Sequence, residues 1–346
     1  MANLVVAGAC NLKCVYCFAG DHMRALKDSA APAFIALEAF EARLDFLDRS
    51  GIDEIRLIGG EPTLHPHFPE LIRRARRRGK HIVVFSHGLL SARALACLEA
   101  LSPDECTVLV NTNATRFPDG PKEEEQTRRR ATLRRLGPRA LLGFTIYRTD
   151  FRLDFLLPLV IETGCRKSIR LGLAQPCLSG SNVHLHPKQY PVVGRKIAAF
   201  ARRAAGAGVK LEFDCGFVRC MFSETDLAAL REAGTDLGWR CNPILDVDLS
   251  GQALHCFPLA DKLQAPLTDS VDAASLRTAL IAQAQPYRLA GIYKECSTCP
   301  FKAGGECMGG CLAGTLRRFR PATIRVVVSA DTLVTAGHAS SVALAG

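Results

Sequence analysis

The sequence lacks the features that mark membrane-spanning and exported proteins. It contains no apolar run of roughly eighteen or more residues, the length that a transmembrane helix requires. Residues 1–6 carry no charged leader and no long apolar segment, so we expect a strand at this end and not a signal peptide. We therefore expect a cytoplasmic protein that has no membrane partner.

The basic segments of the chain lack aromatic residues. The formal net charge is +10. Much of the excess positive charge lies in two segments, whose basic residues are Arg73, Arg74, Arg76, Arg77, Arg78 and Lys80, and Arg128, Arg129, Arg130, Arg134 and Arg135. Because aromatic side chains do not alternate with these charges, nucleic-acid binding is disfavoured. We expect solvated helix faces, and attraction of an anionic substrate or an acidic electron donor is the alternative.

The first half of the chain alternates between strand-like and helix-like segments. The 346 residues, 48% of them hydrophobic, are enough for one large and one small domain. The predicted strands are 3–6, 54–58, 81–85, 107–110, 141–146 and 169–173, and the predicted helices between them are 34–47, 68–78, 91–100, 123–136 and 151–161. This alternation predicts an α/β fold with a parallel sheet covered by helices. Ligands then bind at the carboxyl ends of the strands.

The pattern changes after about residue 187. One more helix, 192–205, and one more strand, 210–213, precede a segment, 215–311, that is rich in cysteine and glycine and has little regular periodicity. Such a segment buries little apolar surface and usually needs a metal or disulfides to hold it together. We divide the chain into an alternating domain (1–185), a connecting region with Cys215 and Cys220 (186–240), a cysteine-rich domain (241–320) and a tail of unknown role (321–346).

Fifteen cysteines are many for a chain in which we expect no export signal. Metal ligation explains them better than disulfides do. Cys10, Cys14 and Cys17 directly follow the first predicted strand, and three thiolates on one loop can bind three irons of a [4Fe–4S] cluster, leaving the fourth iron open for a ligand. A zinc site is the alternative, because thiolates also suit zinc, but no fourth ligand is obvious close by.

The C-x3-C-x2-C spacing of these cysteines, after an N-terminal strand and in an alternating chain, resembles the radical S-adenosylmethionine (SAM) superfamily. A second match, Gly59-Gly60-Glu61-Pro62, ends the second predicted strand and is similar to the GGEP motif of that family. The resemblance covers residues 1 to about 180. It implies a partial (β/α)6 TIM-like barrel, a [4Fe–4S] cluster and SAM as cofactors, and an external one-electron donor such as flavodoxin or ferredoxin. The implied activity is reductive cleavage of SAM to a 5′-deoxyadenosyl radical that abstracts a substrate hydrogen.

The resemblance also implies which residues contact SAM. Tyr16, the aromatic residue before the last cysteine of the loop, would back the adenine. The motif Gly59–Pro62 would hold the methionine amino group, since glycines allow a close backbone approach and a carboxylate or carbonyl can accept from an ammonium. Weaker candidates lie on or after the later strands, namely Ser86, Asn111, Asn113, Arg148 and Arg170. For each of these, an ordinary polar residue at a strand end is the alternative interpretation.

A second set of cysteines has the spacing Cys241-x9-Gly251-x4-Cys256 followed by Cys296-x2-Cys299-x7-Cys307-x3-Cys311. This resembles the SPASM extension of radical SAM enzymes, which carries auxiliary iron–sulfur clusters, and it implies two auxiliary [4Fe–4S] clusters. The chain departs from the family pattern in two ways. Seven residues separate Cys299 from Cys307 where five are usual, and no cysteine follows Cys311 where the family has one.

Two upstream cysteines, Cys215 and Cys220, bring this set to eight, enough for two clusters with four thiolates each. The family partition would place an upstream cysteine with Cys241, Cys256 and Cys311. The other cluster would then have Cys296, Cys299, Cys307 and an open or unusual ligand. A sequential partition would instead keep each quartet of neighbours in the sequence together, and the sequence does not decide between the two. A structural zinc in this region is the alternative to the clusters.

The substrate and the catalytic residues are not identified by these motifs. SPASM relatives mature peptides or act on small molecules in antibiotic pathways. We expect modification of a ribosomally synthesised peptide, with a small molecule of a natural-product pathway as the alternative. The first predicted strand begins near residue 3, so we expect no separate peptide-recognition domain before the barrel. A zinc- or cluster-bearing structural or nucleic-acid-binding protein is the non-enzymatic alternative, and it leaves the motif at Gly59–Pro62 unexplained.

Overall fold

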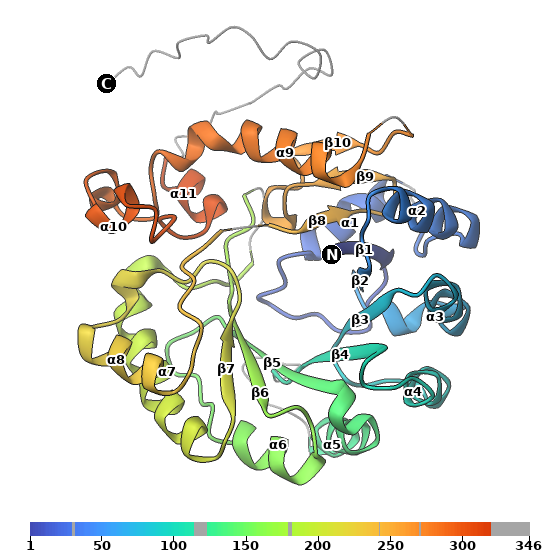
Figure 1. The fold of residues 1–346 in the computed structure, drawn as a ribbon, viewed down its shortest axis with the longest axis horizontal. Coiled ribbons are helices and arrows are strands. Elements are labelled where there is room, and N and C mark those ends of the chain that lie inside the picture. Colours follow the sequence, from blue (N-terminus) through green and yellow to red (C-terminus); the bar gives the residue numbers. More distant parts are fainter. Residues whose placement is uncertain (30–31, 114–122, 179–181, 242, 270, 320–346) are drawn as a thin grey trace, which may run out of the picture.

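A computed structural model describes residues 1–29, 32–113, 123–178, 182–241, 243–269 and 271–319 (Figure 1). The predicted tail, 321–346, lies outside the described residues. One ten-stranded sheet organises the molecule, with strand order β10-β9-β8-β1-β2-β3-β4-β5-β6-β7. Its first seven strands are β1 (Ala2–Ala7), β2 (Glu54–Gly59), β3 (His81–Ser86), β4 (Cys106–Asn111), β5 (Ala140–Ile146), β6 (Ser168–Leu173) and β7 (Lys210–Phe213).

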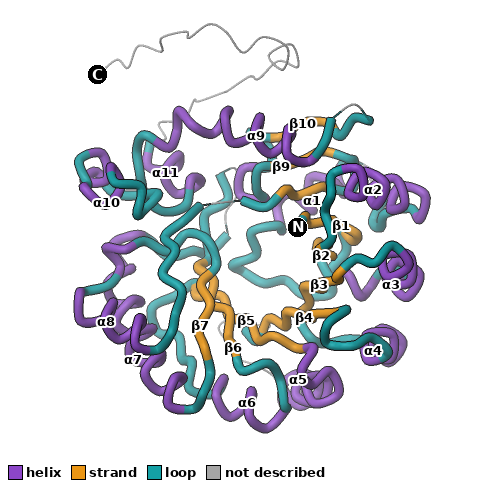
Figure 2. Tube along the Cα trace, viewed as in Figure 1, coloured by secondary structure: helices purple, strands orange, loops and turns teal. Residues whose placement is uncertain are grey.

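Strands β1 to β7 are parallel to their neighbours, so their carboxyl ends share one rim. Figure 2 shows the strands as one curved band with the helices outside it. The helices of this half are α1 (Gly20–Asp28), α2 (Leu37–Arg49), α3 (Phe68–Arg77), α4 (Ala92–Glu99), α5 (Glu123–Leu136), α6 (Leu156–Thr163) and α7 (Tyr190–Gly206). The expected α/β fold with a parallel sheet is confirmed, and β7 adds a seventh parallel strand to the six expected in the barrel.

Helix α2 shows why the periodic segments form helices against this sheet. Phe40, Leu44 and Leu47 recur at helical spacing and are fully buried on one face. Each such side chain contributes about 2 kcal/mol relative to an exposed position. The helix ends before Gly51, whose φ of +62° lies in the left-handed region that glycine adopts without strain.

Two predicted helix starts were wrong. Residues 34–36 are extended instead of helical, because Phe34 bridges Ala7 and the N–H of Ile35 donates to Val6 O at 3.1 Å. Helix α6 begins at Leu156 and not at residue 151. Pro158 explains this late start, since a proline is tolerated only in the first turn of a helix.

The cysteine-rich half contains more regular structure than its sequence predicts. Its elements are α8 (Glu224–Glu232), β8 (Leu245–Val247), β9 (Gln252–Leu254), β10 (Gln264–Pro266), α9 (Ala273–Ala284), α10 (Pro300–Ala303) and α11 (Leu312–Arg318). Strand β8 pairs in parallel with β1, and β8 to β10 extend the barrel sheet beyond that strand. The expectation failed because strands of three residues are too short for periodicity to reveal.

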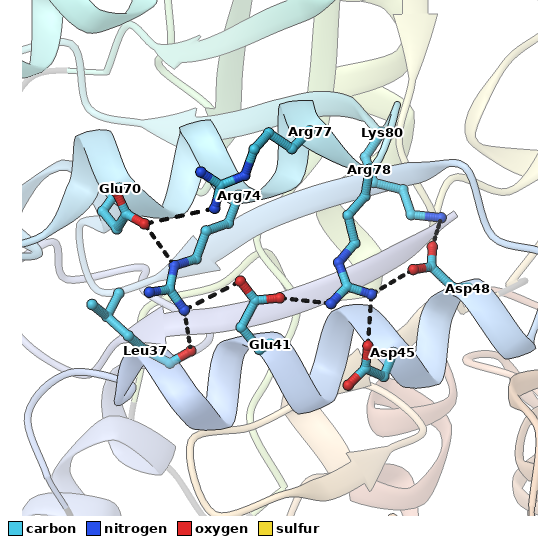
Figure 3. A network of polar contacts seen from close by, with 9 residues as sticks. All are labelled: Leu37, Glu41, Asp45, Asp48, Glu70, Arg74, Arg77, Arg78 and Lys80. Carbon is cyan, nitrogen blue, oxygen red and sulfur yellow. Dashed lines mark hydrogen bonds and ion pairs between the residues drawn. The ribbon is translucent and has the colours of Figure 1, made fainter.

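The first basic segment joins helix α3 to helix α2 (Figure 3). The guanidinium of Arg78 lies within 2.7 Å of carboxylate oxygens of Glu41, Asp45 and Asp48. Arg74 contacts Glu41 at 3.2 Å in the same way. These arginines therefore hold two helices together and are not a free basic surface. Within the described part of the chain, no helix has the length and apolar character needed to cross a membrane.

Candidate functional site

The loop after β1 places Cys10, Cys14 and Cys17 at the carboxyl rim of the sheet. Cys10 is exposed, and Cys14 and Cys17 are partly exposed. Burial raises the pKa of Cys10 to about 11, and the charges of Glu61, Cys14 and Cys17 act in the same direction. The N–H of Leu12 donates to Cys10 Sγ at 3.4 Å, a contact that favours a thiolate.

These three thiols fit an iron–sulfur cluster. They are soft donors carried by one loop that reaches solvent, and all fifteen cysteines of the chain are free of disulfides. Among the described residues, no three cysteine, histidine or acidic side chains converge as the ligands of a single metal ion do. The thiolates that hold a cluster each bind a different iron, so the cluster does not require such convergence.

The glycines after β2 pack against the cysteine loop. Gly59 has a φ of +141°, and a Cβ there would overlap the carbonyl oxygen of Ala7. A Cβ on Gly60 would overlap the carbonyl oxygen of Ala9 in the same way. The N–H groups of Gly60 and Glu61 donate to these two carbonyls at 2.7 and 2.9 Å. The close backbone approach that the glycines allow is therefore made to the residues that lead into Cys10.

Glu61 is buried, and its carboxylate is saturated with hydrogen bonds. Thr63 donates to Oε1 from its backbone N at 3.2 Å and from its hydroxyl at 2.6 Å. Ser86 Oγ and the backbone N of His87 donate to Oε2 at 3.2 and 3.0 Å. A carboxylate offers about four acceptor positions, so these donors fill it. Ser86, predicted to face the ribose, uses its hydroxyl here to tie β3 to the end of β2.

His87 connects the cysteine loop to this carboxylate. Its Nε2 lies 2.7 Å from Asn11 Oδ1 and 3.2 Å from Glu61 Oε2. Its Nδ1 accepts from the N–H of Leu89 at 3.0 Å, which makes Nε2 the protonated nitrogen of the neutral ring. Burial lowers the pKa of His87, so the neutral form is favoured.

Tyr16 and Asn113 lie where the sequence places them, at the rim. The ring of Tyr16 is buried and stacks on Tyr147, with centroids 4.7 Å apart. Asn113 donates to Thr145 O at 2.8 Å and accepts from Thr145 N at 2.7 Å, and so joins the ends of β4 and β5. Asn111 Oδ1 accepts from the N–H of Asn113 at 2.9 Å. Both asparagines therefore shape the rim, whatever ligand they contact.

The two predicted arginine contacts are engaged in ion pairs. Arg148, after β5, pairs with Asp150. Arg170, on β6, pairs with Asp214 at 2.8 Å and lies over the ring of Phe85. The proposed contacts of Arg148 and Arg170 with SAM stay predictions. To bind the SAM carboxylate, each arginine would have to leave its aspartate or contact both carboxylates at once.

Sequence reasoning missed Arg129. This side chain is 5% exposed and comes from α5, where Thr132, Leu133 and Leu136 share its buried face. Its Nε donates to His87 O at 2.9 Å, but its Nη2 is buried and has no hydrogen-bond partner among the described residues. Burial lowers the pKa of Arg129, and the charges of Tyr16, Glu125 and Cys14 oppose this effect. The helical spacing of Arg129 from these three buried residues is the signal that could have revealed it.

Three cysteines of the C-terminal half pack together. Cys241, Cys256 and Cys311 lie in one small apolar cluster with Leu259 and Leu312. Cys307 packs instead into the main core. Cys307 and Cys311, four residues apart along the chain, therefore pack in different apolar clusters.

Comparison with known proteins agrees with these motifs. Residues 4–129 match the family described as the Radical SAM superfamily. GTP 3′,8-cyclase of Chlorobaculum tepidum is 32% identical over 114 residues, which are 32% of this chain and 32% of that protein. Fe-coproporphyrin III synthase of Methanosarcina barkeri is 37% identical over 87 residues, which are 25% of this chain and 21% of that protein. The chain thus aligns with only the smaller part of these curated relatives.

Solved structures share the fold over most of the chain. Streptococcus suis SuiB bound to precursor peptide SuiA has a TM-score of 0.65 at 12% identity, and the match covers 90% of this chain and 72% of that chain. The structure of native anSMEcpe with bound AdoMet and Kp18Cys peptide has a TM-score of 0.62 at 15% identity, with 89% of both chains covered. The part of the chain that carries the cysteine loop and the motif at Gly59–Pro62 therefore matches the Radical SAM superfamily, and most of the chain shares the fold of these solved structures.

Proposed function

We propose that this enzyme cleaves SAM reductively and uses the 5′-deoxyadenosyl radical to abstract a hydrogen atom from a peptide substrate. The observation that carries the proposal is the backbone contact between the cysteine loop and the motif at Gly59–Glu61. This contact places three thiols and a glycine-rich turn at one rim of a parallel sheet. Ligands of such sheets bind at that rim.

A [4Fe–4S] cluster on Cys10, Cys14 and Cys17, when bound, supplies the electron that breaks the sulfonium C–S bond of SAM. The carboxylate of Glu61 is already filled, so we assign the SAM ammonium to backbone carbonyls of Gly59–Glu61. The unpartnered Nη2 of Arg129 then receives the SAM carboxylate, because a buried guanidinium needs an anionic partner. Tyr16 provides the apolar ring surface for the adenine.

The remaining parts of the proposal concern partners and auxiliary cofactors. The eight cysteines from Cys215 to Cys311 would hold two auxiliary [4Fe–4S] clusters. An external one-electron donor such as flavodoxin or ferredoxin would reduce the cluster of the N-terminal loop. Fifteen free cysteines suit a reducing compartment, and we propose that the enzyme acts in the cytoplasm.

Likeness to two peptide-bound structures over 89% or more of the chain supports a peptide substrate. A small-molecule substrate is the second candidate, because two curated relatives are named GTP 3′,8-cyclase and Fe-coproporphyrin III synthase. Those matches cover 32% and 25% of this chain, whereas the peptide-bound structures match 89% or more of it. We therefore place the peptide first.

Anaerobic reconstitution followed by addition of SAM and dithionite tests the proposal. We expect about twelve irons per chain, as three four-iron clusters require, and formation of 5′-deoxyadenosine. Cys14→Ala should abolish deoxyadenosine formation, and a control Cys97→Ala, in helix α4, should not. A fully loaded wild-type protein that forms no deoxyadenosine would contradict the proposed function.

A further inference from the structure

Three of the eight C-terminal cysteines meet in one place although they come from separate elements. Cys241, Cys256 and Cys311 share a small apolar cluster apart from the main core. Cys311 caps helix α11, where its carbonyl accepts from the N–H of Thr315 at 3.0 Å. Cys256 ends the β8–β9 segment, and its carbonyl accepts from the N–H of Leu259 at 3.0 Å. These contacts fix three thiols on one side of the C-terminal half.

Cys215 joins this first group from the barrel. It follows β7 by two residues, and the N–H of Asp214 donates to Leu171 O at 2.9 Å, which fixes the segment to β6. A Cβ on Gly216, the next residue, would overlap Gln175 Nε2, so Cys215 lies beside the segment that follows β6. The same segment reaches the first group, because the N–H of Leu178 donates to Pro258 O at 3.0 Å, two residues after Cys256, and a Cβ on Gly314 would lie 4.0 Å from Pro176.

A second group forms around the ring of Phe301. Cys299 is the N-terminal capping residue of helix α10, which carries Phe301 two residues later. The N–H of Cys307 donates to Phe301 O at 3.0 Å. The guanidinium carbon of Arg219 lies 3.7 Å from the centroid of the Phe301 ring, a cation–π contact. Because Arg219 directly precedes Cys220, this contact brings Cys220 to the segments of Cys299 and Cys307.

Cys296 completes the second group. A Cβ on Gly291 would lie 2.6 Å from Cys296 Sγ and 3.1 Å from Gly309 O, so Cys296 packs beside the turn that follows Cys307. The N–H of Gly309 donates to Cys307 Sγ at 3.4 Å.

Trp239 and Met308 lie between the two groups. Trp239 and Cys307 form an isolated parallel β-bridge, and Trp239 O accepts from the N–H of Met308 at 3.0 Å. Met308 Sδ in turn lies 3.4 Å from the N–H of Cys241. Two short segments of the chain, 215–220 and 307–311, therefore each begin in one group and end in the other.

We propose that Cys220 is the fourth ligand of the auxiliary cluster held by Cys296, Cys299 and Cys307, while Cys215 completes the cluster held by Cys241, Cys256 and Cys311. Cys220 thereby replaces, from upstream, the cysteine that the SPASM pattern has after Cys311 and this chain lacks. The inference rests on the proposed auxiliary clusters. Each cluster then has four thiolates and no open iron, so both transfer electrons and neither binds substrate.

The experiment counts iron in protein that lacks the N-terminal cluster, so it does not depend on SAM cleavage. A Cys14→Ala/Cys17→Ala parent should hold about eight irons in two clusters. Adding Cys220→Ala and Cys299→Ala together removes two ligands of one cluster. We expect about four irons, with one of the two reduced-cluster EPR signals lost and the other unchanged. Adding Cys215→Ala and Cys220→Ala removes one ligand from each cluster, and we expect both EPR signals to change.

The reverse pattern would overturn the inference. If Cys215 and Cys220 bind one cluster, their joint replacement removes one signal, and Cys220→Ala with Cys299→Ala alters both. A single Cys220→Ser variant that keeps the iron, sulfide and EPR spectrum of the parent would also overturn it. Cys97→Ala is the matched control and should leave all three readouts unchanged. A parent that binds no iron would refute the auxiliary clusters themselves, while deoxyadenosine formation by the wild type tests the N-terminal site separately.

Discussion

The ring Nε2 of His87 lies 2.7 Å from the side-chain oxygen of Asn11, in the loop that carries the three N-terminal cysteines. The same nitrogen lies 3.2 Å from Glu61 Oε2. One imidazole therefore connects the cysteine loop, the glycine-rich motif and the end of β3. Because Nδ1 accepts from Leu89, the neutral ring donates from Nε2 and keeps this connection without carrying a charge.

We predict that His87→Leu weakens cluster retention and SAM binding. The lost hydrogen bond to the neutral side chain of Asn11 costs about 0.5–1.5 kcal/mol, which corresponds to a Kd for SAM raised roughly twofold to tenfold. Iron content after gel filtration and equilibrium binding of SAM are the measurements. His87→Gln, which retains a donor near the position of Nε2, should recover part of the loss. Equal SAM affinity in His87→Leu and the wild type would contradict this role.

The alternating half of the fold could be predicted because periodicity and burial agree there. Helix α5 was predicted with its observed bounds, Glu123–Leu136, and so was strand β7, Lys210–Phe213. The β8–β10 strands could not be predicted, because each has only three residues and gains its stability from pairing with β1 or with one another. The pairing of β8 with β1 joins residues more than two hundred positions apart, so it leaves no local signal.

The candidate site was predictable where a motif dictates backbone geometry, and not where a side chain has several uses. Gly59 and Gly60 lie against Ala7 and Ala9 because any side chain would overlap those carbonyls. Ser86 has a hydroxyl that suits a ribose, yet it donates to Glu61. The residues next to Ser86 in the sequence do not show whether its hydroxyl contacts a ribose or Glu61. Only the three-dimensional arrangement shows which partner it has.

Gly59→Ala should be strongly destabilising. The new Cβ would overlap the carbonyl of Ala7, and a φ of +141° is unfavourable for any L side chain. We expect a loss of about 3 kcal/mol or more in the free energy of unfolding, measured by urea denaturation of the cluster-free protein. Gly51→Ala is the matched control, since Gly51 also has a positive φ but its Cβ would meet nothing within 4 Å. It should lose only about 1 kcal/mol, and similar losses in the two variants would show that the contact with Ala7 does not matter.

Arg129→Gln should weaken SAM binding without removing the cluster. The buried Nη2 has no partner among the described residues, so an anionic ligand gains a charge-assisted hydrogen bond there. We expect the Kd for SAM to rise roughly tenfold or more, since such a bond is worth about 1.5–3 kcal/mol. Arg128→Gln removes an exposed neighbour on the same helix and should leave the Kd unchanged. If both variants bind SAM as the wild type does, Arg129 does not hold its carboxylate.

Arg78→Ala should destabilise the protein through the contact of α3 with α2. Arg78 lies within 2.7 Å of three carboxylates on α2, and a network of this kind is worth more than one surface pair. We expect a loss of about 1–2 kcal/mol in the free energy of unfolding, smaller at about 1 M salt because the charges are screened. Arg130→Ala is the control, because Arg130 Nε lies 3.7 Å from Glu162 Oε2, a longer contact than any that Arg78 makes with the three carboxylates. Equal effects of the two substitutions would show that the network adds nothing.

His65 should make the stability of the protein fall in mild acid. The ring is buried, its Nε2 lies 2.8 Å from Ile35 O, and its Nδ1 accepts from the N–H of His67 at 3.0 Å. Both nitrogens are therefore used by the neutral form, and burial lowers the pKa of His65 below its value of about 6.5 in the unfolded chain. The unfolded state then binds the proton more tightly than the folded state does. The stabilisation is complete above about pH 6.5 and declines as the pH falls toward the folded pKa.

The change that isolates this effect is His65→Gln, which keeps a donor for Ile35 O but does not titrate. Wild type and variant should differ in the slope of unfolding free energy against pH between about pH 7.5 and 5.5, by up to about 1.4 kcal/mol per pH unit for one proton. Urea midpoints at several pH values give that slope. Other histidines titrate in both proteins, so only the difference between the two slopes reports on His65. Parallel curves would mean that His65 is protonated equally in the folded and unfolded states, contrary to the environment in which its ring is buried.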